Sequence, residues 1–333
     1  MPARGRHGGE GVTRLSRWVA LATLAGLVAA LWVLGRVGLA QVVRSVLRIG
    51  VGGFVLYVLV HGAALWVLGL AWARSAAEPM RPVRLFAWAR TVREAANELL
   101  PFSQLGGLFV GIRVILAAGL PPARVYASTV IDSLTEIASQ IVYVLAGLAI
   151  LGLLIGHAEA GGITAAAWAG VGVLGVLTVA AVALQRHVLA FAGRVAGRFV
   201  PDIADAIGAV QVELAAVGRR PAALLSSFAA NLVAWLIGAG SSWLALRLLG
   251  APIPVWSAVA LEAVISVVRS GAFLIPGAIG AQEIGYAALA PLVGIPAEAA
   301  LAVSLLKRAR DLAIGVPALL VWQAAEARRR QAS

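Results

Sequence analysis

The 333-residue sequence has no cysteine, one lysine (Lys307) and few charged residues, which make up 13% of the chain. The absence of cysteine excludes disulfides, thiolate metal sites and cysteine nucleophiles. The four histidines show no metal-ligand spacing, and the sequence has neither a Walker-type phosphate loop nor a G-x-S-x-G motif. We therefore expect no metal site and no cofactor.

Hydrophobic residues, in contrast, make up 61% of the chain, far more than in soluble domains. This composition predicts an all-α polytopic membrane protein that forms a single transmembrane domain over residues 1–333. The formal net charge of +12 comes from arginines in short breaks between apolar runs. Such a distribution sets orientation in a membrane, so we expect no nucleic-acid partner.

Two kinds of apolar segment follow one another along the chain. Two stretches, 84–119 and 255–293, are interrupted by prolines, glycines and polar residues, and we predict broken or re-entrant helical hairpins there. The other apolar runs are long enough to cross about 30 Å of hydrocarbon, and we predict six full spans at 18–35, 51–73, 125–155, 163–184, 222–249 and 297–325.

Arginine-rich loops face the cytoplasm in most membrane proteins. By this rule both termini are cytoplasmic, and so is the 185–221 segment, which we predict to be an amphipathic helix on the inner surface. The loop 36–48 conflicts with the rule, because it contains three arginines and is placed outside.

The two interrupted stretches resemble each other. In the first, Leu99-Leu100-Pro101 is followed by Gly119-Leu120-Pro121, and in the second Leu274-Ile275-Pro276 is followed by Gly294-Ile295-Pro296. The offset from Pro101 to Pro276 is 175, and it defines repeat cores at 84–155 and 255–325. The predicted topology inverts one copy relative to the other, an arrangement typical of alternating access. Alternatively, the prolines and glycines only kink packed helices.

Charged residues within the last span of each repeat form a second candidate feature. Asp132 and Glu136 share one helix face, and a carboxylate at the bilayer centre costs at least about 2.5 kcal/mol. We predict that they approach Lys307 and Arg310, as part of a transport mechanism or as a static brace. The predicted intramembrane charge network comprises Asp132, Glu136, Lys307, Arg308, Arg310 and Asp311.

Polar residues around the two breaks are the candidate substrate site. Arg93 and Arg269 present guanidinium groups suited to a lipid phosphate or pyrophosphate, although each could instead pair with a neighbouring glutamate. His61 and Asn231, each alone in an apolar span, are interpreted as helix-helix hydrogen bonders. The candidate substrate-binding residues are Arg93, Asn97, Glu98, Pro101, Gln104, Arg113, Arg269, Pro276, Gly277, Gly280, Gln282 and Glu283.

Three motifs resemble those of the lysylphosphatidylglycerol synthase transmembrane-domain family, also called flippase-like. The string P-G-x-x-G-x-Q-E at 276–283 is similar to the family's second motif, 99–107 with Arg113 to its first, and 304–311 to its last helix. The resemblance covers about 84–325. Within the family, the motifs look most like those of the hopanoid-biosynthesis-associated subgroup HpnL. Gly107 departs from the pattern, because much of the family has an acidic residue there.

This resemblance implies a lipid flippase or transporter in the bacterial inner membrane rather than an enzyme. The implied partner is a membrane lipid, either a hopanoid or a phospholipid or isoprenoid precursor, with hopanoid-biosynthesis proteins as candidate protein partners. The aminoacyl-lipid synthase activity belongs to a separate soluble domain and is not implied. Two alternatives stay open: a membrane-embedded lipid transferase with Glu98 or Glu283 as general base, and a non-catalytic scaffold.

Overall fold

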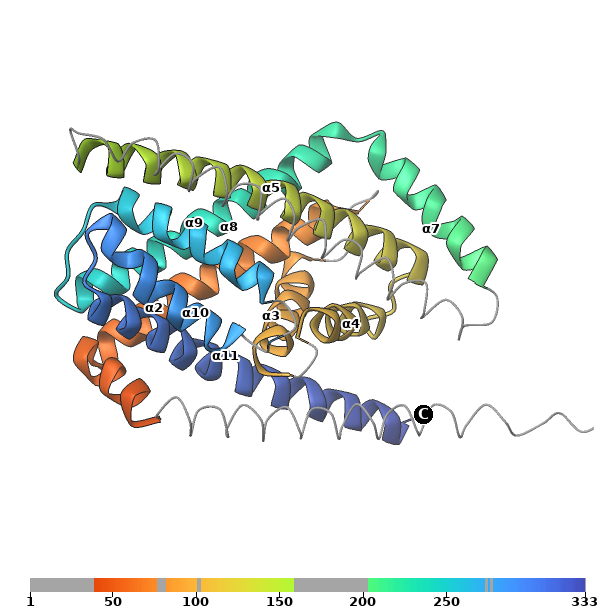
Figure 1. The fold of residues 1–333 in the computed structure, drawn as a ribbon. Helices are drawn as coiled ribbons and strands as arrows, with labels where there is room; N and C mark the ends of the chain where they lie inside the picture. The colour runs from red at the N-terminus through yellow and green to blue at the C-terminus, as the bar shows by residue number, and fades with distance from the viewer. Residues whose placement is uncertain are drawn as a thin grey trace, which may run out of the picture.

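The computed structural model describes residues 39–76, 82–100, 103–158, 203–272, 275 and 278–332. These residues form helices and no strand, which confirms the predicted all-α fold class (Figure 1). The helices are α2 (Leu39–Arg74), α3 (Val83–Leu99), α4 (Ser103–Leu116), α5 (Pro122–Ala158), α7 (Ile203–Gly218), α8 (Pro221–Leu248), α9 (Val255–Gly271), α10 (Ala281–Leu289), the 3₁₀ helix η2 (Ala290–Val293) and α11 (Ala297–Ala332).

Three of the described helices, α2, α5 and α8, are long and apolar enough to cross a membrane. They contain the predicted spans at 51–73 and 125–155 and all but the last residue of the predicted span at 222–249. In α2 the first of these follows a kink at Gly50, whose φ of 72° is favourable only for glycine. The predicted span at 297–325 lies within the 36-residue α11, which carries charged residues. The predicted spans at 18–35 and 163–184 and residues 185–202 of the 185–221 segment lie outside the described residues, whereas 203–218 of that segment form α7.

The two interrupted stretches form shorter helices. The first consists of α3 and α4, with 17 and 14 residues, and the second of α9 and α10, with 17 and 9 residues. A helix of 17 residues reaches about 26 Å, which is less than the roughly 30 Å of hydrocarbon. The chain breaks lie between α3 and α4 and between α9 and α10, as predicted, but Pro101, Pro276 and Gly277 themselves lie outside the described residues.

The end of each interrupted stretch has the same local structure. Gly119 and Gly294 have φ values of 82° and 76°, in the left-handed region that glycine adopts without strain. The next long helix starts at Pro122 in the first case and at Ala297 in the second, so the helix starts keep the offset of 175 found in the sequence. In Figure 1, α5 runs from right to left and α11 from left to right.

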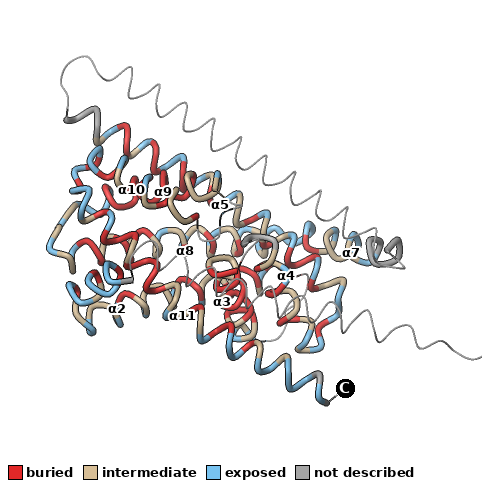
Figure 2. The backbone as a smooth tube through the Cα atoms, turned by 60° about the horizontal axis from the view of Figure 1, so that its bottom comes forward, coloured by how far each residue is buried: buried red, intermediate tan, exposed pale blue. Residues whose placement is uncertain are grey.

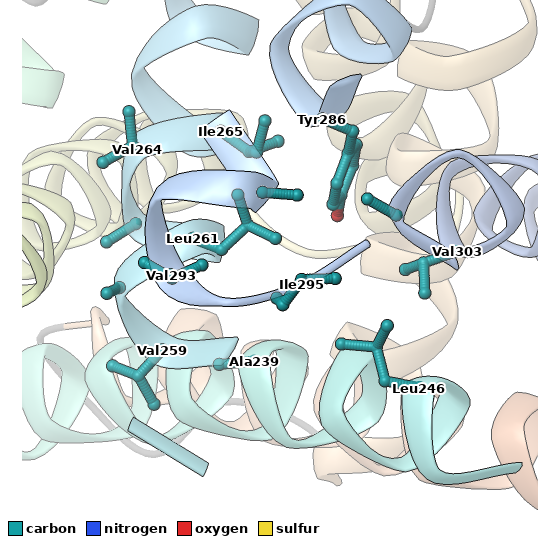
Figure 3. Close-up of a cluster of buried hydrophobic side chains, with 14 of the residues drawn as sticks. Ala239, Leu246, Val259, Leu261, Val264, Ile265, Tyr286, Val293, Ile295 and Val303 are labelled. Carbon is teal, nitrogen blue, oxygen red and sulfur yellow. The ribbon is translucent and has the colours of Figure 1, made fainter. Parts of the chain in front are cut away.

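Buried apolar side chains form two clusters. The first lies around α9, α10 and η2, and Figure 3 shows Leu261, Ile265, Tyr286, Val293 and Ile295 gathered there. The second lies around α3 and α4 and includes buried side chains of α2 and α11. Figure 2 shows that the buried positions follow the inner faces of the helices. Each interrupted stretch therefore has an apolar core of its own.

Close approach of backbones holds α2 against α3. A Cβ atom built on Gly69 would lie 2.5 Å from the backbone nitrogen of Ala87 and 2.9 Å from its Cβ. Real Cβ atoms do not come so close to backbone atoms, which cannot move aside like a side chain. The glycine is therefore required by the helix contact.

We predict that Gly69→Ala destabilises the protein by about 1 to 3 kcal/mol, because the added methyl group overpacks the contact with α3. The measurement is thermal unfolding in detergent micelles. Gly62→Ala is the matched control on the same helix, since a Cβ there meets nothing within 4 Å, and it should be neutral or slightly stabilising. Equal melting temperatures for the two variants would contradict the contact.

Candidate functional site

A cavity of about 300 Å³ lies within the helix bundle, enclosed mainly by α2, α3, α5, α8, α9 and α11. Its described lining contains five basic and five acidic side chains, so its formal charge is balanced. These side chains are Arg90, Arg93, Arg269, Lys307 and Arg310, and Glu94, Glu98, Glu136, Glu262 and Asp311.

The first charge cluster joins α3 to α5. The Arg90 Nη1 lies 3.3 Å from Asp132 Oδ2, and Arg93 Nη1 lies 3.2 Å from the same oxygen. Both arginines also pair with Glu136, with 3.1 Å between Arg93 Nη2 and Glu136 Oε2. Asp132 is completely buried, and Glu94 forms a further ion pair with Arg90 at 2.9 Å. The positive charges of Arg90 and Arg93 are thus compensated by the carboxylates of Asp132 and Glu136.

The predicted pairing of Asp132 and Glu136 with Lys307 and Arg310 is therefore wrong. The carboxylates on α5 face arginines of α3, within the same repeat, rather than the last helix of the other repeat. The reason is that the guanidinium groups of α3 lie within ion-pair distance of both carboxylates and compensate their charge without the last helix. Arg90 and Arg93 are spaced i, i+3 and the two carboxylates i, i+4, so both pairs lie on faces that meet.

The second cluster joins the ends of the two interrupted stretches. Glu98, one residue before the end of α3, forms an ion pair with Arg269 near the end of α9. Arg269 also donates to Gln282 on α10. On α11, Arg308 lies 3.3 Å from Glu283 and 3.9 Å from Glu98. This is the only described ion-pair cluster that links α3 to α9, and it lies where the two chain breaks approach each other.

Glu283 has a structural part in this cluster. Its Oε2 accepts a hydrogen bond of 2.7 Å from the backbone N–H of Gly280, which caps the start of α10. Its Oε1 accepts a hydrogen bond of 3.0 Å from Ser304 on α11. Glu283 thus links the N-terminus of α10 to α11. A carboxylate at the start of a helix also interacts favourably with the helix dipole.

The third cluster lies on α11. Lys307 Nζ is 2.5 Å from Glu262 Oε2 on α9, and the hydroxyl of Tyr286 donates to the other oxygen of Glu262. Arg310 pairs with the adjacent Asp311 at 2.7 Å and its guanidinium lies over the ring of Tyr57, with 5.6 Å to the ring centroid. The Asp311 and Arg310 side chains are both about nine-tenths buried.

The predicted site residues fall into three groups. Arg93, Asn97, Glu98, Glu136, Arg269, Lys307, Arg310 and Asp311 line the cavity. Asp132, Gly280, Gln282, Glu283 and Arg308 support it from behind, through the contacts given above. Arg113 pairs with Glu326 near the end of α11 instead, and Pro101, Pro276, Gly277 and the side chain of Gln104 are outside the described part of the chain.

Three cavity residues were missed or interpreted otherwise. Arg90 was not a candidate, although its spacing to Glu94 and Arg93 on α3 could have indicated it. Asn231 does make the predicted helix-helix hydrogen bond, donating to Thr135 Oγ1 at 3.3 Å, but it also lines the cavity. His61 lines the cavity as well, and no sequence pattern around it in α2 signals this.

Several polar atoms of the lining are unpaired. Among the described residues, His61 Nδ1, Asn97 Oδ1 and Asn231 Oδ1 are buried and have no hydrogen-bond partner. A buried polar group without a partner costs about 1 to 3 kcal/mol. Together with the paired charges, these atoms make the cavity suited to a polar group surrounded by hydrocarbon.

The family model of the lysylphosphatidylglycerol synthase transmembrane region matches residues 18–318. The chain belongs to this family. Membership makes it a membrane protein with a lipid-related role, and the match contains every residue of the cavity lining. No curated protein and no solved structure matches the chain significantly.

The structure leaves no room for a side chain at Gly107. A Cβ at this position of α4 would overlap the side chain of Asn97 and lie 2.5 Å from the carbonyl oxygen of Arg93. An acidic side chain therefore does not fit between α4 and α3 in this arrangement. The cavity carboxylates of this chain come from other positions.

We predict that Asp132→Ala costs about 3 kcal/mol of stability, since it leaves two buried guanidinium groups with one carboxylate fewer. Unfolding in detergent followed by circular dichroism measures the loss. Glu298→Ala is the control, because its 3.1 Å ion pair with Arg48 joins side chains that are 80% and 60% exposed, and such pairs contribute less than about 1 kcal/mol. A cost for Asp132→Ala no larger than for Glu298→Ala would refute the buried cluster.

Proposed function

We propose that this protein is a lipid flippase or transporter of the bacterial inner membrane. The observation that carries the proposal is the charged cavity inside a helix bundle in which α2, α5 and α8 are long and apolar enough to cross a membrane. Ten formally charged side chains line it, and a membrane protein bears the cost of buried charge mainly at substrate or ion pathways. A lipid headgroup is a polar group that would enter such a cavity while its tails stay in hydrocarbon.

We propose alternating access between two inverted repeats as the mechanism. Three observations support it: the equal offset of 175 between the helix starts at Pro122 and Ala297, the matching left-handed glycines before them, and the opposite directions of α5 and α11 in Figure 1. In transporters built this way, substrate binds between the repeats at broken helices. Here the cavity lies beside the ends of α3 and α9, where the two chain breaks begin.

In this proposal the headgroup is handled at the Glu98 and Arg269 pair. These two side chains line the cavity and connect the ends of α3 and α9. A headgroup phosphate can replace the carboxylate at Arg269, because guanidinium binds both in the same forked geometry. Exchange of this partner would separate the two repeats on one side, which couples binding to opening.

The lipid class rests on the sequence motifs. The resemblance to the hopanoid-associated subgroup favours a hopanoid pathway, with phospholipid or isoprenoid precursors as the other candidates. A transferase acting on the same lipids is the second candidate, with Glu98 as general base. Product formation from an added donor separates the two functions.

We predict that Arg269→Gln and Glu98→Gln each reduce lipid translocation at least about tenfold, because each leaves a buried charge unpaired in the cavity. The assay uses proteoliposomes with NBD-labelled phosphatidylglycerol, phosphatidylethanolamine or a polyprenyl phosphate, and bleaching of the outer leaflet by dithionite. Arg48→Gln is the control, since it removes an exposed charge that is not part of the cavity lining. Unchanged translocation in folded Arg269→Gln and Glu98→Gln proteins would rule out this headgroup site.

We also predict the orientation of the repeats. Ala117 and Ala297 are exposed positions beside the turns at 119–121 and 294–296. The sequence has no cysteine, so Ala117→Cys and Ala297→Cys each introduce a single thiol. A membrane-impermeant maleimide added to intact cells should label the second variant and, only after permeabilisation, the first. Labelling of both from the same side would contradict the inverted repeat.

A further inference from the structure

The single lysine of the chain lies in the cavity. The sequence has 27 basic residues, and every one except Lys307 is an arginine. Of the five cationic side chains in the described cavity lining, the other four are arginines. Lys307 is bound to Glu262, with 2.5 Å between Nζ and Oε2, and each side chain of this pair is 10% exposed. The pair therefore differs chemically from the other ion pairs of the cavity.

The surroundings of Glu262 hold it in either protonation state. Tyr286 on α10 donates its hydroxyl to Oε1, and the Lys307 ammonium lies 5.3 Å from the centroid of the Tyr286 ring. A tyrosine hydroxyl can donate to a carboxylate or accept from a carboxylic acid. Glu262 can thus take up a proton without losing its hydrogen-bonded position.

The other charged groups around the pair are bound to ion partners of their own. Arg269 of α9 is paired with Glu98, and Arg310 of α11 with Asp311. In the described cavity lining, the ionisable groups of α2 and α5 are His61, Tyr143 and Glu136, of which Glu136 is held by two arginines, while Tyr57 of α2 lies against Arg310. Glu262 is the cavity carboxylate whose cationic partner is an ammonium rather than a guanidinium fork.

This difference matters because the lining is balanced at five positive and five negative groups. An anionic headgroup that enters adds a net negative charge to a buried space, which is costly in low dielectric. One proton bound together with the headgroup restores the balance. A flexible, compact ammonium can move from a neutralised carboxylate to a phosphate, whereas a bidentate guanidinium pair is held in fixed geometry.

We propose that Glu262 and Lys307 form a proton-binding site that couples one proton to the movement of each phosphate-bearing lipid headgroup. The proton adds to the Glu262 carboxylate and gives the carboxylic acid. The Lys307 ammonium, released from its partner, then binds the headgroup phosphate. When the headgroup leaves on the other side, Glu262 releases its proton there and the ion pair with Lys307 forms again. This inference rests on the proposed transport function.

The test uses proteoliposomes with NBD-phosphatidylglycerol and a proton-sensitive dye in the lumen. Symport of one proton with one negative charge is electroneutral, so a one-unit pH gradient should shift the leaflet distribution by up to about tenfold, whereas a potassium-valinomycin potential should have no effect. In Glu262→Gln the response to pH should be lost and a response to the potential should appear. Glu298→Gln, an exposed carboxylate on the same helix as Lys307, should behave like the unmodified protein.

Lys307→Arg provides the second variant, because it keeps the charge and removes the ammonium. It should weaken the pH response, since a guanidinium fork holds the carboxylate more firmly. A pH response that survives in folded Glu262→Gln, or translocation of the unmodified protein that follows the potential and not the pH gradient, would overturn the proton site while leaving the transport function intact.

Failure of the transport function is distinguished by infrared difference spectroscopy on the protein in lipid vesicles. Addition of short-chain phosphatidylglycerol should produce a carboxylic-acid C=O band that is missing in Glu262→Gln. If no probe lipid is translocated but this band appears, proton-linked phosphate binding stands and transport of these probes does not. If the band is absent, or persists in Glu262→Gln, the proton site is refuted.

Discussion

The exclusion of unpaired charge from hydrocarbon is the constraint on which the rest of the structure depends. A charged side chain at the bilayer centre costs several kcal/mol unless it is paired or hydrated. This chain places ten such side chains around one cavity, and each has an ion partner on the same or a facing helix. The positions of α3, α5, α9 and α11 follow from this, because their charged faces turn toward one another rather than toward lipid.

The broken helices follow from a related requirement. A helix that ends at membrane depth leaves backbone groups without intrahelical partners, and lipid cannot satisfy them. Here α10 begins with a carboxylate cap from Glu283 to Gly280, and the same carboxylate binds Ser304 on α11. The cavity charges and the helix ends are therefore connected, because Arg269 donates a hydrogen bond to Gln282 on α10.

Sequence periodicity predicted which helix faces are charged, but not which faces meet. The spacing of Asp132 and Glu136 identified a face that cannot contact lipid, and that face is buried. That its partners lie on α3 rather than on α11 could not be predicted. A repeat offset shows which helices are equivalent, but not which of them are in contact. Positions of single polar residues, such as His61, were likewise indistinguishable from ordinary helix-helix contacts. The last span of the first repeat was predicted to start at 125, whereas α5 starts at Pro122, and it is the observed starts at Pro122 and Ala297 that repeat the offset of 175, since glycine and proline fix local backbone geometry independently of packing.

Charge balance also determines what the cavity can accept. Where arginine forks hold a carboxylate from two sides, as at Glu136, the cluster is better suited to stability than to exchange, because neither partner can leave without exposing a buried charge. Glu98 has one close arginine, Arg269, with Arg308 at 3.9 Å, and Glu262 is paired with Lys307 alone among the described cations, so these two pairs would open at lower cost. During transport of a headgroup, the cluster between α3 and α5 would keep the first repeat rigid. The pairs between α3 and α9 and between α9 and α11 would rearrange.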